Sequence, residues 1–383
     1  CQYSAGTLYT VTRPASRCCP GITMSPPTAS RNDAPCLAWS MILCTCLYLS
    51  GCRTLPDWRP SWSRSEQPPV PSDSFLLPPE GTDVVGIVQI ATTRQEDTLS
   101  DLARRYDLGY EEIVAANPGV DPWLPGEGTR VVLPTQFVLP DAPREGLVLN
   151  LAAMRLFYYP VPGADEAPRV ITHPIGIGRE GWQTPQGTSR ITQKIVKPAW
   201  TVPASVRREH ARKGDPLPPV VPPGPDNPLG DFAMRLSLPS YLIHGTNQPW
   251  GVGIRVSHGC VRLYPEDIAR LFPEVPKGTR VNIVNQPYVA GWQNGQLYLE
   301  AHQPLAEDAR RWGKSLRPME QAVARKAAES DIVNWDKARK VALEARGIPV
   351  PVSPDSPDLA DVLTAAPRVP SNPPWTLADD REG

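Results

Sequence analysis

The chain has 383 residues, with 39 lysines and arginines against 40 aspartates and glutamates, so its formal net charge at pH 7 is −1. This balance gives no electrostatic reason to expect nucleic acid as a partner, because such binding depends on neutralising phosphates with basic side chains. The length is ample for a substantial core within a multi-domain exported protein.

Residues 1–52 are predicted to be a leader with a signal peptide. Met24 is a candidate start residue, and Arg31 supplies a weak positive charge ahead of the apolar run 37–49. That run is too short to span a bilayer comfortably and is typical of a signal peptide. It ends in Leu-Ser-Gly-Cys52, which resembles a bacterial lipobox, where cleavage precedes the cysteine and the cysteine is acylated. A retained membrane anchor and a chance apolar stretch are the alternatives.

Acylation of Cys52 would give the protein a lipid anchor, since several acyl chains together bind a membrane firmly. Arg53 rather than Asp follows this cysteine. By analogy with enterobacterial sorting, we expect the periplasm or cell envelope, with a lipid anchor in the outer membrane. Residues 53–84 are rich in Pro, Ser, Trp and Arg and are predicted to be a linker without a core of its own.

Residues 85–135 are predicted to form a compact βααβ unit. A strand is expected over 86–91, and helical spacing begins after the capping pattern at 96–100. A second helix is expected over 110–117, followed by a turn and a closing strand within 124–134.

The βααβ unit resembles a LysM domain. It carries Asp-Thr-Leu at 97–99, Asn-Pro at 117–118 and Pro-Gly at 125–126, in that order. The resemblance implies binding to glycan strands that contain N-acetylglucosamine, chiefly peptidoglycan and chitin. A small structural unit without a ligand is the alternative.

Residues 144–286 are dominated by short strand-like runs that Gly and Pro interrupt, which predicts an antiparallel β-rich domain. One short helix is expected over 265–272. The lid segment, residues 198–230, is rich in proline and has little strand pattern. We expect a long loop there that covers the site, because long loops in compact domains are usually functional.

Three segments follow the β-rich domain. Residues 287–302 contain a predicted β-hairpin with an Asn-Gly turn. Residues 303–347 are charged and Ala-rich and are predicted to be a helical extension. Residues 348–383 are Pro-rich and predicted to be a disordered tail. The predicted fold class is therefore mainly β, with a small βααβ domain before the β-rich domain and helices after it.

Cys260 is the residue on which the functional prediction depends. The other seven of the eight cysteines lie at or before Cys52, within the predicted leader and its processing site. A lone cysteine with histidines nearby is typical of an activated nucleophile. Because the thiolate is the reactive form, a base must be close, and His244 and His258 are the candidates. Gly259 would let a carbonyl carbon approach and leave backbone N–H groups for an oxyanion hole.

His244-Gly245, a loop, and then Ser-His-Gly-Cys-Val-Arg at 257–262 together resemble the active-site motif of the L,D-transpeptidases, the YkuD domain family. Thr-Pro at 184–185 and Asn-Pro-Leu-Gly at 227–230 match further elements. The resemblance covers about residues 146–302. Together with the preceding LysM unit, it is similar to members of the ErfK/YbiS type and implies a β-rich YkuD-type fold.

The resemblance also implies roles for single residues. Cys260 would be the nucleophile and His244 the general base, with the backbone carbonyl of Gly245 orienting the imidazole. The backbone amides of Gly259 and Cys260 would hold the oxyanion.

Four further residues have implied roles around this core. Ser257 and His258 would shape the site. Arg262 would either fix the loop or bind a substrate carboxylate. Trp200 would be either a core anchor for the lid segment or a platform for the substrate.

The implied reaction is acyl transfer on peptidoglycan stem peptides. Cys260 would attack the L,D peptide bond between the diamino acid and D-Ala of a tetrapeptide, releasing D-Ala and leaving a thioester. An amine from a second stem peptide, or from a lysine of an envelope lipoprotein, would then take the acyl group. The resemblance implies neither a metal nor an organic cofactor.

Several alternatives stay open at this point. The same site could use water and act as an L,D-carboxypeptidase, or the protein could be a non-catalytic peptidoglycan-binding lipoprotein. Cys260 could be a buried apolar residue. A zinc site of His244, His258 and Cys260 is disfavoured, because their spacing is not that of a zinc ribbon or finger.

No catalytic role is predicted for the remaining three histidines or for two acidic residues of the short helix. We expect His173, His210 and His302 to be loop or surface residues. Glu266 and Asp267 are expected to serve the start of the short helix, where acidic side chains suit the helix dipole.

Overall fold

The computed structural model describes residues 72–327 and 332–373. The predicted leader, the predicted lipidation site Cys52 and most of the predicted linker lie outside the described residues. Among the residues that are described, no helix combines the length and the apolar character that a bilayer span requires.

The βααβ prediction is confirmed. Strand β3 (Gln89–Thr92) pairs antiparallel with β4 (Arg130–Leu133), and helices α1 (Leu99–Arg105) and α2 (Tyr110–Ala116) lie between them in the chain. The side chain of Asn117 closes the unit, since it donates to the Val132 carbonyl and accepts from the Val132 amide at 2.8 and 2.7 Å. A short pair of strands, β2 (Val84–Gly86) and β5 (Gln136–Val138), brackets the unit.

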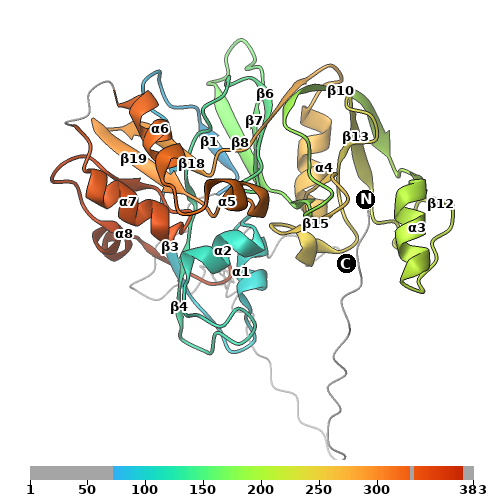
Figure 1. Cartoon of the computed structure of the whole chain (residues 1–383), viewed down its shortest axis with the longest axis horizontal. Coiled ribbons are helices and arrows are strands. Elements are labelled where there is room, and N and C mark those ends of the chain that lie inside the picture. Colours follow the sequence, from blue (N-terminus) through green and yellow to red (C-terminus); the bar gives the residue numbers. More distant parts are fainter. Residues whose placement is uncertain (1–71, 328–331, 374–383) are drawn as a thin grey trace, which may run out of the picture. The chain divides into compact units, whose positions relative to one another are not determined.

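A nine-stranded sheet forms the centre of the β-rich domain (Figure 1). In spatial order its strands are β1 (Ser74–Leu76), β8 (Arg169–Pro174), β7 (Arg155–Tyr159), β6 (Gly146–Asn150), β17 (Arg280–Val284), β10 (Gly187–Val196), β13 (Phe232–Leu236), β14 (Leu242–His244) and β16 (Val261–Arg262). Most neighbours are antiparallel as predicted, but β6 with β17 and β14 with β16 are parallel. Strand β1 lies within the predicted linker, so the folded part begins earlier in the chain than expected.

The sheet carries one main core. Helix α4 (Pro265–Glu274) buries Ile268, Leu271 and Phe272 in the same cluster as residues of the central strands. Strands β9 (Ile177–Gly178) and β15 (Arg255–Ser257) form a separate parallel pair, and a 3₁₀ turn over Pro249–Gly251 precedes β15. These short elements surround the loop that carries Cys260.

The lid segment is not the irregular loop that its prolines predicted. It contains β11 (Trp200–Thr201), helix α3 (Ala204–Arg212) and β12 (Val220–Val221), and the two strands pair with each other. Asn227 holds the ends of the segment together: its amide donates to the carbonyls of Pro198 and Pro222 at 2.8 and 3.0 Å. Because proline has no backbone N–H, a Pro-rich segment has few backbone donors for its own carbonyl groups. A side-chain donor such as the Asn227 amide takes their place.

The C-terminal part forms its own small sheet and core. The predicted hairpin is present as β18 (Tyr288–Gln293) and β19 (Gln296–Ala301), and β20 (Val350–Pro351) joins it. The predicted helical extension is present as helices α5 (Ala306–Trp312), α6 (Arg317–Lys326) and α7 (Trp335–Glu344). Residues of α6 and α7 pack against the hairpin.

The prediction of a disordered tail is wrong for residues 348–373. Helix α8 (Leu359–Ala365) and strand β21 (Arg368–Val369) lie there, and β21 pairs parallel with β3 of the βααβ unit. The physical reason is burial: Ile348, Val350 and Val352 are each at most 2% exposed, as is Val369 in β21. The prediction of disorder rested on the proline content of the segment and gave no weight to these few apolar residues.

A buried ion pair joins the βααβ unit to the central sheet. Arg155 on β7 donates from Nε and Nη2 to the two carboxylate oxygens of Glu112 on α2, at 3.0 and 2.9 Å. The Arg155 guanidinium also donates to the backbone carbonyl of Asp107 at 2.7 Å. Both side chains of the pair are almost inaccessible, so each charge depends on the other.

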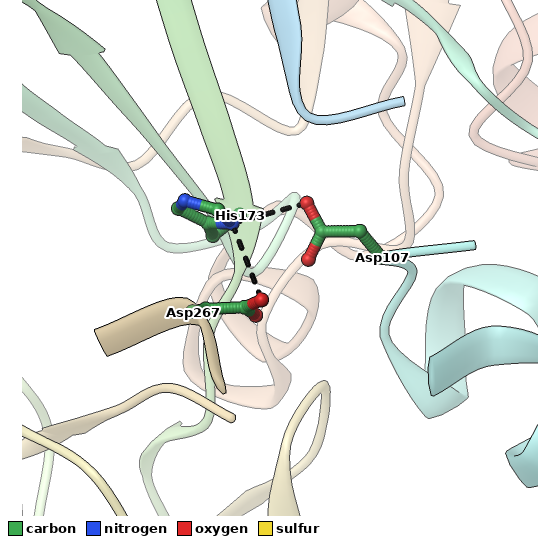
Figure 2. Close-up of side chains that lie close together, drawn as sticks. All are labelled: Asp107, His173 and Asp267. Atoms are coloured by element: carbon green, nitrogen blue, oxygen red, sulfur yellow. Dashed lines mark hydrogen bonds and ion pairs between the residues drawn. The ribbon is translucent and has the colours of Figure 1, made fainter. Parts of the chain in front are cut away.

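A second cluster lies beside this pair (Figure 2). His173 Nδ1 is 3.0 Å from Asp107 Oδ2 and 3.6 Å from Asp267 Oδ1. Burial raises the pKa of both carboxyl groups well above their usual range and lowers the pKa of the His173 imidazole. Asp267 does begin helix α4, but its side chain faces this cluster rather than solvent.

The prediction of three ordinary loop or surface histidines is wrong. His173 is 1% exposed, and His210 and His302 are also buried. Each has an acidic neighbour: His210 Nδ1 is 3.0 Å from Asp215, and His302 Nε2 is 2.6 Å from Glu300. A single sequence does not reveal these acidic partners, because tertiary packing determines which side chains lie beside each histidine.

We expect Arg155→Leu to lower the free energy of unfolding by about 3–5 kcal/mol, because the Glu112 carboxylate would stay buried without its cation. The double variant Arg155→Leu/Glu112→Leu should recover most of the loss, since it buries no unpaired charge. Urea unfolding measures both values. A single-variant loss below about 1 kcal/mol, the range of surface pairs, would contradict the buried pair.

Candidate active site

The parallel pairing of β14 with β16 brings Cys260 and His244 together. Ile243 lies opposite Val261, and His244 lies opposite Arg262. Continuing this register by one residue places Cys260 level with Leu242, two positions from His244. Side chains two positions apart on neighbouring strands point to the same face. Residues sixteen apart in sequence thus become neighbours on one face.

The His244 imidazole is fully buried and has one hydrogen bond that orients it. Its Nδ1 lies 2.6 Å from the backbone carbonyl of Gly245. A carbonyl only accepts, so Nδ1 carries the proton and Nε2 carries the lone pair. No group in the described part of the chain meets hydrogen-bond geometry with Nε2. Nε2 is therefore the atom that can accept a proton.

Burial lowers the pKa of His244 well below its usual value, and the positive charge of Arg262 lowers it further. The imidazole is therefore neutral near pH 7, which is the state that a general base requires. The Gly245 carbonyl lies where the family resemblance implies it.

Cys260 is 3% exposed and packs with the apolar side chains of the lid segment. Its cluster contains Trp200, Val202, Val206 and Leu229. Its Sγ lies 3.7 Å from the carbonyl oxygen of Ser240. Nucleophilic chemistry requires the thiolate form of this cysteine.

The turn before Cys260 is held by its own hydrogen bonds. Ser257 Oγ donates to the Cys260 carbonyl at 2.6 Å and accepts from the Gly259 amide at 3.1 Å. The prediction that the Gly259 amide serves the oxyanion hole is not supported, because that amide already donates to Ser257. Thr184 Oγ1 donates to the Gly259 carbonyl at 2.9 Å, which fixes the turn from the other side.

Gly259 is required at its position for two reasons. Its φ of +103° lies in the region that favours glycine. A Cβ built there would lie 2.7 Å from a ring carbon of Tyr241. Any side chain would therefore move either the turn that carries Cys260 or the Tyr241 ring.

The His258 side chain points toward the charged groups of Glu209 and Arg179. Its Nε2 lies 3.0 Å from Glu209 Oε2 and 3.1 Å from Arg179 Nη2. Its ring meets Trp182 edge-on, with centroids 4.6 Å apart. Burial lowers the pKa of His258 to about 4, although the hydrogen bond to Glu209 opposes the shift. Of the two histidines proposed as the base, the geometry favours His244.

Comparison with known proteins identifies two domains in the chain. A sequence model of the L,D-transpeptidase catalytic domain, YkuD, matches residues 144–283, and a LysM domain model matches residues 91–125. The chain is 43% identical to the probable L,D-transpeptidase YcfS of Escherichia coli, over 62% of this chain and 75% of that protein. It is 40% identical to the probable L,D-transpeptidase ErfK/SrfK of Salmonella typhimurium, over 75% and 93%. YbiS of E. coli, also named a probable L,D-transpeptidase, is 45% identical over 61% and 76%.

The chain belongs to the L,D-transpeptidase family. As an L,D-transpeptidase with a LysM domain, it is an acyltransferase that depends on a cysteine, and peptidoglycan is its substrate. The predicted mainly β fold is also confirmed.

Two predicted substrate residues of this L,D-transpeptidase are buried. Arg262 is fully inaccessible on β16, and its backbone exchanges two hydrogen bonds of 2.9 Å with Gly176. This favours the first of its two predicted roles, fixing the loop. Trp200 is 4% exposed within the Cys260 cluster, which favours a core anchor over an open substrate platform.

Sequence reasoning missed Glu209, Arg179 and Trp182. None stands in a recognisable motif, and Glu209 lies in a segment that was predicted to be an irregular loop. Only the fold brings these three side chains to His258.

We expect the His244 imidazole to titrate well below the usual histidine value of about 6.5, because burial and Arg262 disfavour its charged form. Arg262→Gln should move this transition to higher pH, since it removes the positive charge. NMR of protein labelled at its five histidines follows the titration, and His244→Gln assigns the signal. A transition at or above pH 6.5 in the unsubstituted protein would refute the neutral base.

We expect Gly259→Ala to lower kcat by at least about tenfold, since a displacement costing over 1.4 kcal/mol in the transition state has that effect. Gly278→Ala is the matched control: its φ is +94° and nothing lies within 4 Å of the added Cβ. The control should lose about 1–2 kcal/mol of stability and keep its activity. Equal kcat values for the two variants would show that the contact with Tyr241 does not matter.

Proposed function

We propose that this L,D-transpeptidase acts on peptidoglycan stem tetrapeptides through a thioester at Cys260, and that it forms cross-links between stem peptides. The observation that carries the proposal is the neutral, oriented His244 imidazole on the same face of the sheet as Cys260. A base with a bare Nε2 near a cysteine is the arrangement that nucleophilic acyl transfer needs.

The first half-reaction breaks the bond between the diamino acid and D-Ala. His244 Nε2 takes the proton of the Cys260 thiol, and the sulfur attacks the carbonyl carbon. The C–N bond then breaks, and the imidazolium returns the proton to the leaving amine, so D-Ala departs and a thioester remains. The Gly245 carbonyl stabilises the imidazolium through Nδ1 in this step.

The second half-reaction transfers the acyl group to an amine. The amine attacks the thioester, its proton passes to His244, and the Cys260 sulfur leaves and is protonated again. Water in place of the amine would make the enzyme an L,D-carboxypeptidase. The burial of Cys260 beneath the lid segment supports transfer, because excluding water prevents hydrolysis of a reactive intermediate.

We further propose that the LysM domain binds the glycan strands whose stem peptides are the substrate. The acceptor amine belongs either to a second stem peptide or to a lysine of an envelope lipoprotein. Within this proposal the enzyme works in the periplasm or cell envelope, where peptidoglycan lies, and Cys52 provides a lipid anchor in the outer membrane. The lipobox at residues 49–52 is the support for that anchor.

Product analysis tests the reaction. The chain from Arg53 to Gly383 contains all of the described residues, which form one compact unit, and it lacks every cysteine except Cys260. It would be incubated in reducing buffer with disaccharide-tetrapeptide and analysed by mass spectrometry. A dimer joined between two diamino acids supports cross-linking. Tripeptide and D-Ala without dimer favour the carboxypeptidase or a protein acceptor. No reaction together with intact sacculus binding favours a non-catalytic scaffold.

We expect Cys260→Ala to abolish D-Ala release while binding to purified sacculi stays unchanged, because the thiol and the LysM unit are separate parts of the chain. Quantitative D-Ala detection and a sacculus pull-down measure the two properties. Retained turnover in this variant would eliminate the thioester mechanism.

A further inference from the structure

A charged cluster beside Cys260 has no part in the acyl-transfer steps. Arg179 Nη2 donates to both carboxylate oxygens of Glu209, at 2.6 and 2.7 Å. Glu209 also contacts His258 Nε2 at 3.0 Å and accepts from Lys213 at 2.7 Å. His258 stands two residues before Cys260 in the chain. Three segments that are distant in sequence therefore meet at one carboxylate.

Glu209 belongs to α3, the helix of the lid segment. Val206, three residues earlier and so on the same face of the helix, is 1% exposed in the apolar cluster of Cys260. Helix α3 thus has two anchors beside the nucleophile, an apolar one at Val206 and an ionic one at Glu209.

The ionic anchor is charged at neutral pH. Hydrogen bonds from Lys213, His258 and Arg179 hold the pKa of Glu209 at about 2. The Glu209 side chain is only 12% exposed and that of Arg179 is 29% exposed. Charge-assisted hydrogen bonds in such a partly enclosed position are stronger and more directional than a surface ion pair.

The Glu209 carboxylate also determines how His258 lies. Between the edge-on contact with Trp182 and the hydrogen bond to Glu209, the imidazole has a single orientation. The turn of residues 257–260, which Ser257 and Thr184 hold by hydrogen bonds, begins next to this ring. Glu209 therefore restrains both the lid segment and the His258 side chain at the start of this turn.

We propose that Glu209 is a positioning residue for acyl transfer: it fixes His258 and holds helix α3 over Cys260, so that an amine rather than water reaches the thioester. This inference rests on the proposed function. It identifies the contact that gives the lid segment its closed position, and it connects that contact to the choice between transfer and hydrolysis.

The principal test is the product ratio of Glu209→Gln, which keeps the shape of the side chain and removes its charge. We expect the ratio of cross-linked dimer to tripeptide to fall by about fivefold or more, because water gains access to the intermediate. The rate of D-Ala release should change less than about twofold, since His244 and Cys260 keep their positions. Arg208→Gln is the matched control, because Arg208 is an exposed neighbour on the same helix.

A second measurement does not depend on activity. In reduced protein, alkylation of Cys260 by iodoacetamide should be about threefold or more faster in Glu209→Gln and in Arg179→Gln than in the control, because the helix covers the thiol less tightly. The double variant Glu209→Gln/Arg179→Gln should be alkylated little faster than either single variant, since both changes break the same contact. Thermal denaturation shows whether each variant remains folded.

The outcomes separate the two proposals. An unchanged product ratio in a folded Glu209→Gln variant overturns the positioning role, as does a loss of D-Ala release equal to the loss of dimer. If the unsubstituted protein releases no D-Ala, the proposed function fails. The alkylation rates then test by themselves whether Glu209 holds helix α3 over Cys260. Equal alkylation rates in Glu209→Gln and Arg208→Gln overturn it.

Discussion

The site depends on the parallel register between β14 and β16. This register sets His244 opposite Arg262 and places Cys260 two positions from His244 on the same face. A slip of one residue would turn one of the two side chains to the opposite face and separate His244, the proposed base, from Cys260, the proposed nucleophile. The loop between the strands can therefore vary in shape, but the pairing of these few residues cannot.

Around this pairing, charged side chains connect segments that lie far apart in the sequence. Arg155 and Glu112 join the LysM domain to the sheet, and Glu209 joins the lid segment to the His258 turn. The C-terminal strand β21 adds a third strand to the LysM sheet. The LysM and catalytic domains are consequently connected by specific polar contacts and by backbone pairing.

Predictions failed where contacts between distant segments decide the outcome. The tail at 348–373 is ordered because its few valines and isoleucines are buried against other segments, although its composition is that of a disordered chain. The lid segment is more regular than its prolines predicted, because its apolar side chains are buried in one cluster and Asn227 donates to the carbonyls of Pro198 and Pro222. The Gly259 amide was assigned to the oxyanion hole because the sequence does not show that Ser257 turns back to bind it.

The sequence by itself determined the family, the βααβ unit and the mainly β fold, and through the family motif it predicted Cys260 as the nucleophile and His244 as the base. These depend on short motifs and on local periodicity, which neighbouring residues impose through covalent spacing. Only the tertiary structure decided how His244 and His258 are oriented, which side chains hold the lid segment and which acids and histidines are buried. Those properties arise from side chains separated by tens of residues, whose meeting depends on sheet register and burial rather than on local sequence.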